Sequence, residues 1–242
     1  MLPVIDPEKI AEKYNHIEQI WNQDDKWHYK TNREISKFLR SISDKYKFHE
    51  SCEIANIGSG GNAYCFDETH MLHIDIAKAK ILNKKRFLEA NVEKLPLADG
   101  CFDLVLCIGS VLNYCNVNEA ISEISRITKP GGFLVLEYES SKSFEYFKTQ
   151  HYCKSCTCVE TFYNNNFEKL YVYSESHIDS LLIRKNWFAL QKKRFHIISP
   201  LIYKFTKRAN FAQHFMSLDW FFRKIPILGN NSANIIMFLQ KK

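Results

Sequence analysis

Up to about residue 50, hydrophobic residues recur every three or four positions, which is the spacing of an amphipathic helix. Pro7–Gln23 and Thr31–Tyr46 both show this spacing, so the sequence predicts two N-terminal helices. The apolar faces are formed by Ile10, Tyr14, Ile17 and Trp21 in the first helix, and by Ile35, Phe38, Leu39 and Ile42 in the second.

From Cys52 onward the pattern changes to short apolar runs that alternate with turns and a helix. The run Phe102–Ile108 is almost entirely apolar, as expected of a central strand that is covered on both faces. Such an alternation predicts parallel strands joined by right-handed crossovers, and hence an α/β fold. The predicted strands are Glu53–Ile57, Met71–Ile74, Arg86–Leu88, Phe102–Ile108 and Phe133–Tyr138, with a helix over Glu119–Thr128 that Lys129-Pro-Gly-Gly132 ends.

After Tyr138 this rhythm stops. Val159–Phe162 and Glu168–Tyr173 are typical of a hairpin with Asn164–Asn166 at its turn. Ser176-His-Ile-Asp179 reads as a capping box that opens a helix. The remaining predicted elements are a strand over Trp187–Phe195, an aromatic helical region over Ile197–Leu228 and a closing strand over Ala233–Leu239.

Composition is that of a folded domain, because 45% of the residues are hydrophobic and 25% are charged. The N-terminus is polar and does not resemble a signal peptide. The longest apolar stretch, Leu104–Leu112, is about half the length needed to span a bilayer. We therefore expect a cytoplasmic protein without a transmembrane segment, whose eight cysteines are free thiols.

The net charge of +6 is unevenly distributed along the chain. Residues 1–183 carry 21 Lys and Arg against 26 Asp and Glu, whereas residues 184–242 carry 12 against one, Asp219. A solvated basic face would account for this. An acidic partner, such as nucleic acid, a phosphorylated or lipid-linked substrate or an anionic membrane surface, is the alternative.

Two features point to a nucleotide-like ligand. Ile57-Gly-Ser-Gly-Gly61 follows a predicted strand directly, and glycines there allow the backbone to turn sharply and approach a ligand. Asp75 ends the next strand, where a carboxylate can accept hydrogen bonds from both hydroxyls of a ribose. Without the glycines, a helix cap would be the better interpretation of Asp75.

Two further segments complete a set: Asn91-Val-Glu-Lys-Leu-Pro96 with Phe102-Asp-Leu-Val105, and Lys129-Pro-Gly-Gly132. In this order, the segments between Cys52 and Tyr138 resemble the methyltransferase type 11 group of class I S-adenosylmethionine (SAM)-dependent methyltransferases. The resemblance implies a Rossmann-like sheet of about seven strands, with N-terminal helices and a C-terminal α+β elaboration that forms a lid. We expect a helical cap over residues 1–50, a SAM-binding core over 51–140, and an acceptor-binding region with the closing strands over 141–242.

The same resemblance implies roles for individual residues. SAM is the implied cofactor, with the glycine turn facing its methionine moiety and ribose, and Asp75 holding the ribose hydroxyls. Ile76 would lie beside the adenine, and Asn91 and Val92 at its edge. The full set of implied cofactor-binding residues is Gly58, Ser59, Gly60, Asp75, Ile76, Asn91, Val92, Ile108 and Gly109, the last two lining the methyl-transfer position.

Three departures from the group's pattern stand out. Asn56 replaces the acid that usually precedes the first glycine by two residues, and Asn91 replaces the acid at the adenine edge. Only nine residues, Asn62–His70, connect the glycines to the second strand, which is too short for the usual helix. This combination is similar to methyltransferases of glycan and natural-product pathways, and it leaves open a SAM-binding module that has lost catalysis.

The methyl acceptor is less defined by the sequence. Methyl transfer is an in-line displacement, and an alcohol or amine acceptor must also lose a proton, for which histidine is the usual base. We take His28, before a helix that could close over the cofactor, as the first candidate catalytic residue and His151 as the second. We predict methyl transfer to oxygen or nitrogen of a small or carrier-linked, possibly acidic metabolite.

The C-terminal region offers an alternative, in which basic and aromatic residues bind RNA or a peptide as the acceptor. We favour a core-facing aromatic stripe instead. We expect residues 159–228 to roof the carboxyl edge of the sheet, with Phe205, Phe211, Phe215, Trp220 and Phe221 in the acceptor pocket and basic residues facing the acceptor.

A cysteine-rich segment, His151-x-Cys153-x-x-Cys156-x-Cys158, places four possible metal ligands close together. Zinc sites of this kind usually pair two separated knuckles, and the sequence has no second one. We therefore predict no bound metal.

Overall fold

The computed structural model describes residues 3–21, 24–49, 51–163 and 166–242, and its centre is a seven-stranded sheet. The strand order is β3-β2-β1-β4-β5-β9-β8, and β1 to β5 are parallel. Because β9 is antiparallel to both neighbours, β8 points in the same direction as β5. The predicted α/β sheet of about seven strands is confirmed. Its strands are β1 (Ile54–Ile57), β2 (Met71–Asp75), β3 (Phe87–Glu89), β4 (Phe102–Cys107), β5 (Thr128–Glu139), β8 (Trp187–Phe195) and β9 (Asn234–Lys241).

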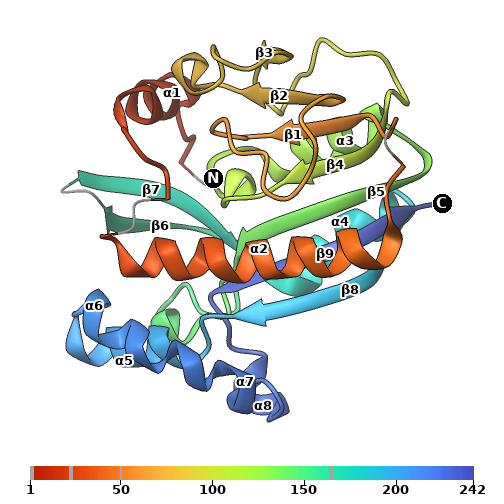
Figure 1. The fold of residues 1–242 in the computed structure, drawn as a ribbon. Helices are drawn as coiled ribbons and strands as arrows, with labels where there is room; N and C mark the ends of the chain where they lie inside the picture. Colours follow the sequence, from red (N-terminus) through yellow and green to blue (C-terminus); the bar gives the residue numbers. More distant parts are fainter. Residues whose placement is uncertain (1–2, 22–23, 50, 164–165) are drawn as a thin grey trace.

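Each face of the sheet carries its own apolar core, because side chains alternate along a strand. In β4, Leu104 and Leu106 point to the face covered by α2 (Lys26–Tyr46), where Phe38 and Leu39 are buried. Val105 and Cys107 point to the opposite face, which is covered by α3 (Val117–Ile127) and α4 (Glu175–Arg184). Figure 1 shows α2 lying across one face, with α3 and α4 behind the sheet.

The carboxyl ends of the strands lie at one edge, and several segments gather there (Figure 1). Helix α1 (Pro7–His16) lies near the ends of β1 and β2. A separate hairpin, β6 (Cys156–Tyr163) with β7 (Asn166–Tyr173), extends from the end of β5, and its turn at residues 164–165 falls outside the described part of the chain. Helices α5 (Ile198–Thr206), α6 (Ala209–Ala212), α7 (Asp219–Phe222) and α8 (Pro226–Gly229) follow β8. None of the described helices combines the length and apolar character needed to cross a membrane.

Several element boundaries differ from the predicted ones for local reasons. Helix α1 ends at His16, and the predicted end at Gln23 lies outside the described residues. Helix α2 begins earlier than predicted because the Asp25 carboxylate accepts the backbone N–H groups of Trp27 and His28. Helix α4 is capped by Ser174 rather than by the predicted Ser176. Strand β5 begins at Thr128, so Lys129-Pro-Gly-Gly132 lies within its first part rather than in a preceding turn.

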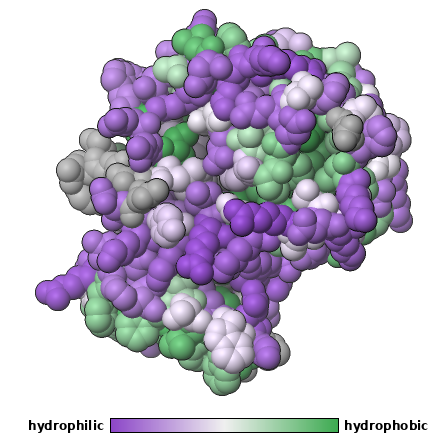
Figure 2. All heavy atoms as spheres, viewed as in Figure 1, coloured by the Kyte–Doolittle hydropathy of each residue, from purple (hydrophilic) through white to green (hydrophobic). Residues whose placement is uncertain are grey.

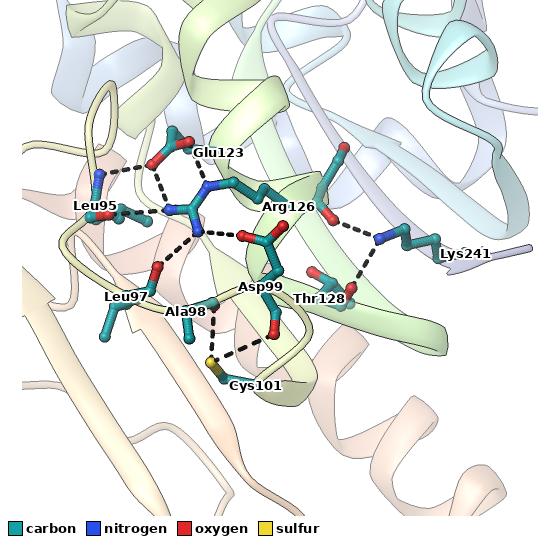
Figure 3. A network of polar contacts seen from close by, with 10 residues as sticks. Leu95, Leu97, Ala98, Asp99, Cys101, Glu123, Arg126, Thr128 and Lys241 are labelled. Atoms are coloured by element: carbon teal, nitrogen blue, oxygen red, sulfur yellow. Dashed lines mark hydrogen bonds and ion pairs between the residues drawn. The ribbon is translucent and has the colours of Figure 1, made fainter.

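The loop that leads into β4 is held in place by Arg126 of α3 (Figure 3). The Arg126 guanidinium donates to the main-chain carbonyls of Leu95 (3.0 Å) and Leu97 (2.6 Å), and it pairs with Asp99 and Glu123 at 2.8 Å. Glu123 also accepts the backbone N–H of Leu95 at 2.7 Å. The network fixes the segment that follows Asn91 and Val92 against the helix.

Candidate functional site

The glycine turn after β1 forms the floor of a cavity. Gly58 and Gly60 have φ angles of +61° and +52°, a region that favours glycine, and the Gly58 N–H donates to the Ile74 carbonyl at 2.8 Å. A Cβ at Gly58 would lie 2.1 Å from Val111 Cγ2, so no larger residue fits there. The Asn56 amide donates to the Asn62 carbonyl at 2.6 Å, which closes the short connector that replaces a helix.

Asp75, at the end of β2, shapes this turn through its carboxylate. One oxygen accepts the Gly60 N–H and the other the Ala77 N–H, both at 2.8 Å. Burial raises the pKa of Asp75, and these backbone hydrogen bonds oppose the rise. Asp75 therefore orients the turn and also lines the cavity, where its remaining lone pairs can accept further hydrogen bonds.

The other predicted cofactor-binding residues surround the same cavity. Ile76, Asn91 and Val92 line one side of it, and Ile108 and Gly109 line the end next to β4. Ser59 also lines it, while Gly60 contributes through its hydrogen bond to Asp75. The Asn91 side chain accepts the Glu93 N–H at 2.9 Å, which shapes the turn after β3.

Glu137 fixes the loop after β4 from inside the protein. One of its carboxylate oxygens accepts the backbone N–H groups of Gly109 (3.0 Å) and Ser110 (2.8 Å), and the other accepts the Asn234 amide at 2.8 Å. The side chain is fully buried, which raises its pKa, and these hydrogen bonds oppose the rise. A carboxylate with three donors holds Gly109 rigidly at the junction of two cavities.

Helix α1 covers the first cavity and makes contacts in two directions, towards the short helix η1 (Lys78–Lys80) and towards the hairpin beside the second cavity. On one side, the side-chain carbonyl oxygen of Asn15 accepts the backbone N–H of Ala79 at 3.0 Å, within η1. On the other, Lys13 forms an ion pair with Glu168 of β7. Tyr14, Ile20 and Trp21 from this N-terminal region line the cavity.

A second cavity of about 360 Å³ adjoins the first, and the two share Tyr14, Ile20, Trp21, Gly109 and Tyr114. Its walls come from the N-terminal segment, the ends of β5 and β9, the hairpin and helices α5 and α6. Acids and aromatic rings predominate among its polar and large residues, and no Lys or Arg lines it within the described chain. These side chains are Asp25, Glu139, Glu145, Glu168, Tyr14, Tyr114, Tyr146, Tyr203, Trp21 and Trp27.

The two candidate bases are placed differently. His28 lines the second cavity, and its Nδ1 lies 2.7 Å from the Asp25 carboxylate. His151 lines neither of the two adjoining cavities. It lies in a separate hollow, with its Nδ1 3.0 Å from the Thr157 hydroxyl. His28 thus borders the second cavity and His151 does not, and the role of either as a base stays a prediction.

The five C-terminal aromatic residues that we expected in an acceptor pocket lie outside the lining of the second cavity. None of them lines the second cavity; Tyr203 and Ala209 are the residues of this region that do. Figure 2 shows hydrophobic residues on the surface of the lower part, where α5 to α8 lie. The Asp219 carboxylate accepts the backbone N–H groups of Ile197 and Ile198 at 3.1–3.2 Å, which ties the start of α7 to the start of α5. The exposed residues are Phe205, Phe211, Trp220 and Phe221, and Phe215 is half-buried.

The expectation that C-terminal basic residues face an acceptor stays a prediction, although several of these residues have partners within the protein. Those of β8 form ion pairs with acids from earlier in the chain. Lys192 and Arg194 both contact Glu175 at 2.6 Å, and Lys193 contacts Glu34 at 2.9 Å. The uneven charge along the sequence is therefore partly neutralised by the fold.

All eight cysteines are free thiols, as predicted. Cys156 and Cys158 line the same separate hollow as His151. The described residues contain no group of three or more His, Cys, Asp or Glu arranged to hold a metal ion.

Sequence reasoning missed the two acids at the end of β5. Glu137 holds the loop after β4, and Glu139 lines the second cavity. Their signal is a pair of acids two residues apart that ends an otherwise apolar strand, which places both side chains on the same face at the carboxyl edge.

Comparison with known proteins agrees with this geometry. Residues 50–136 match the family described as a methyltransferase domain. A relative from Buchnera aphidicola subsp. Baizongia pistaciae, named malonyl-[acyl-carrier protein] O-methyltransferase, is 38% identical over 85 residues, which are 29% of this chain and 34% of that protein. The chain thus matches about a third of that relative's length.

Solved structures extend the likeness in fold to the whole chain. The [4+2]-cyclase SpnF has a TM-score of 0.63 at 13% identity, with 99% of this chain and 98% of that chain covered. The 1,6-didemethyltoxoflavin-N1-methyltransferase of Burkholderia thailandensis, solved with S-adenosylhomocysteine, has a TM-score of 0.56 at 13% identity, with coverage of 100% and 93%. At these identities the likeness shows the fold alone.

Proposed function

We propose that this chain is an enzyme that transfers the methyl group of SAM to a small or carrier-linked acceptor. Its residues 50–136 belong to the methyltransferase-domain family of the class I, SAM-dependent type. The methyl group goes to an oxygen or nitrogen atom. SAM is held in the cavity above the glycine turn, and the acceptor in the adjoining cavity.

One observation carries this proposal: the two cavities meet at Gly109. The predicted cofactor-binding residues surround the first cavity, and the second begins where the methyl group would be presented. An in-line displacement requires the attacking atom, the methyl carbon and the leaving sulfur to lie on one line, so an acceptor must approach from the side opposite the sulfonium. Two adjoining cavities with a shared wall provide that arrangement.

The residues of the first cavity fit SAM. The glycine turn provides a backbone cradle that a Cβ would fill, and Asp75 presents a buried carboxylate with oxygens available to ribose hydroxyls. Apolar side chains of Ile76 and Val92 flank the position of a base. When bound, SAM supplies an activated methyl group; the protein's own part is to orient the acceptor and remove its proton.

The alternative acceptor, RNA or a peptide held by the C-terminal region, has less support. The basic side chains of β8 are engaged in ion pairs, and the cavity next to Gly109 is lined by acids, which repel a phosphate backbone. The name of SpnF indicates that this fold also hosts cyclisation, so a chemistry other than methyl transfer is the competing outcome of the test.

The test begins with binding of SAM and S-adenosylhomocysteine, measured by isothermal titration calorimetry. We expect both to bind to the wild-type protein, and Asp75→Ala to weaken both. The loss of hydrogen bonds to a charged group costs about 1.5–3 kcal/mol each. Glu89→Ala is a matched control, because Glu89 also ends a strand but is exposed and pairs with Lys78.

Turnover is then measured as S-adenosylhomocysteine released with pooled amines and alcohols as acceptors. Wild-type affinity retained by Asp75→Ala would contradict the cofactor site. Tight SAM binding without any methylated product from the pools would favour a binding module or another chemistry.

A further inference from the structure

The second cavity is strongly acidic where it meets the cofactor cavity. Glu139 ends β5 and lies beside Ser110, whose hydroxyl donates to the Glu139 carboxylate at 3.2 Å. Glu145, in the short helix η3 (Phe144–Tyr146), and Glu168 of β7 line the same space. A pocket built this way repels an anionic acceptor and attracts a cationic one.

Ion pairs within the described residues remove only part of this acidity, because Lys13 pairs with Glu168 while no Lys or Arg pairs with Glu139 or Glu145. The Glu145 side chain has no hydrogen bond or ion pair among them. Lys204 lies near, yet its ammonium donates to the main-chain carbonyls of Glu145 and Phe147 and does not line the cavity. Burial raises the pKa of Glu145, while Lys207 and Lys204 lower it only in part.

One of the protein's own ammonium groups, that of Lys13, lies at this wall. The Lys13 ammonium pairs with Glu168 and lies 5.0 Å from the ring centroid of Tyr14 and 5.9 Å from that of Tyr114. Both tyrosines line the cavity, and their rings meet edge to face at 6.1 Å. A carboxylate combined with two aromatic rings is a typical site for an organic cation.

We infer that the acceptor is a cationic amine with an aromatic or apolar body, methylated on nitrogen, and that Glu139 accepts the amine's proton. The inference rests on the proposed function and names the substrate class of the same site. It differs from the acidic acceptor that the basic C-terminal region suggested.

The reaction balances with groups that are present. The amine enters as an ammonium, and its positive charge beside Glu139 lowers the pKa of that carboxyl group and favours the ionised form. It then transfers one proton to the Glu139 carboxylate. The nitrogen lone pair then forms the N–C bond, while the electron pair of the breaking S–C bond stays on sulfur, giving S-adenosylhomocysteine and an N-methylammonium product. Glu139 returns its proton to water. Burial, together with the charges of Glu137 and Glu145, raises the pKa of Glu139 to about 8, which suits a base acting on an amine.

The experiment compares three probes that share a phenyl ring and differ in charge: phenethylamine, 2-phenylethanol and 3-phenylpropionate. Each is titrated by calorimetry into protein saturated with S-adenosylhomocysteine. We expect the amine to bind about ten-fold or more tightly than the alcohol, and the carboxylate most weakly, because one charge pair in a partly buried site is worth more than a ten-fold change.

Two variants test the named carboxylates. Glu139→Gln and Glu145→Gln should each weaken amine binding about ten-fold while leaving S-adenosylhomocysteine affinity unchanged. Glu160→Gln is the control, because Glu160 is an acid of the β6–β7 hairpin that is exposed and lies outside the second cavity. With a deuterated methyl donor, mass spectrometry should place the label on nitrogen, and Glu139→Gln should lose the pH dependence of turnover near neutrality.

The outcomes separate the two proposals. Failure of S-adenosylhomocysteine to bind would reject the proposed function itself. If it binds, then equal or absent binding of the three probes, a preference for the alcohol or the carboxylate, or unchanged amine affinity in both variants would overturn the amine inference alone.

Discussion

Glu139→Gln should stabilise the folded protein, and the gain should increase with pH. The folded protein holds the pKa of Glu139 at about 8 because the side chain is buried and Glu137 and Glu145 lie near, whereas its ordinary value is 4.5. Below pH 4.5 the carboxyl is protonated in both the folded and the unfolded chain, so it contributes no difference. Between the two pKa values only the unfolded chain loses the proton, and stability falls as the pH rises.

The size of the effect follows from the two pKa values. The difference corresponds to at most about 4–5 kcal/mol above pH 8, and to roughly 3 kcal/mol at pH 7. Glutamine does not titrate, so the variant escapes this cost, although its amide must still find partners where Ser110 now donates. We therefore expect the wild type and the variant to be similar at about pH 5 and to diverge steadily towards about pH 8.

Urea unfolding at a series of pH values measures this directly as the free energy of unfolding of each protein. The matched control is Glu119→Gln, an exposed acid on α3, for which the difference should stay nearly constant with pH. Parallel pH profiles for the wild type and Glu139→Gln would refute the reasoning, because they would mean that Glu139 ionises in the folded protein as it does in water.

Other predictions concern the glycine turn, the loop before β4 and the cysteine-rich segment. Gly58→Ala should lower the free energy of unfolding by more than the roughly 1–2 kcal/mol of left-handed strain, and it should abolish SAM binding. Gly131 also has a positive φ, +76°, but has open space around it, so Gly131→Ala should show the strain alone. Equal unfolding free energies of the two variants would contradict this. Arg126→Ala should destabilise the protein by about 1–3 kcal/mol in urea unfolding, because main-chain carbonyls of Leu95 and Leu97 lose a charged donor. Metal analysis should find no stoichiometric zinc, and about one zinc per chain that is lost in a Cys153→Ser/Cys156→Ser variant would overturn that expectation.

The first cavity was predictable because its determinants are local in sequence. A glycine turn after one parallel strand and an acid at the end of the next must meet at the same edge of the sheet, whatever else the chain does. The same topology brings Asn91 and Gly109 to that edge. The strands themselves are marked by apolar runs, so six of the seven sheet strands could be located to within two residues at each end, whereas β5 begins five residues before its predicted start.

The second cavity could not be predicted because its determinants are far apart. Glu139, Glu145 and Glu168 come together only through the path of β5 and the pairing of β6 with β7. Nothing in the local sequence indicates which way the aromatic side chains of residues 205–221 point. Whether it faces the pocket or the surface depends on how Asp219 ties α7 to the start of α5, a contact across more than twenty residues.

The two cavities are built from different parts of the chain, and this has an evolutionary consequence. Most residues around the first cavity lie within the segment that relatives share, whereas the acids and rings of the second come mostly from outside it. Mutations that alter acceptor choice can therefore accumulate in the hairpin and terminal helices without eroding the nucleotide site. Proteins that diverge in this way would keep a recognisable sequence around the first cavity, while their flanking segments would lose detectable similarity. Sequence similarity in that core segment is therefore a poor guide to the molecule that each protein modifies.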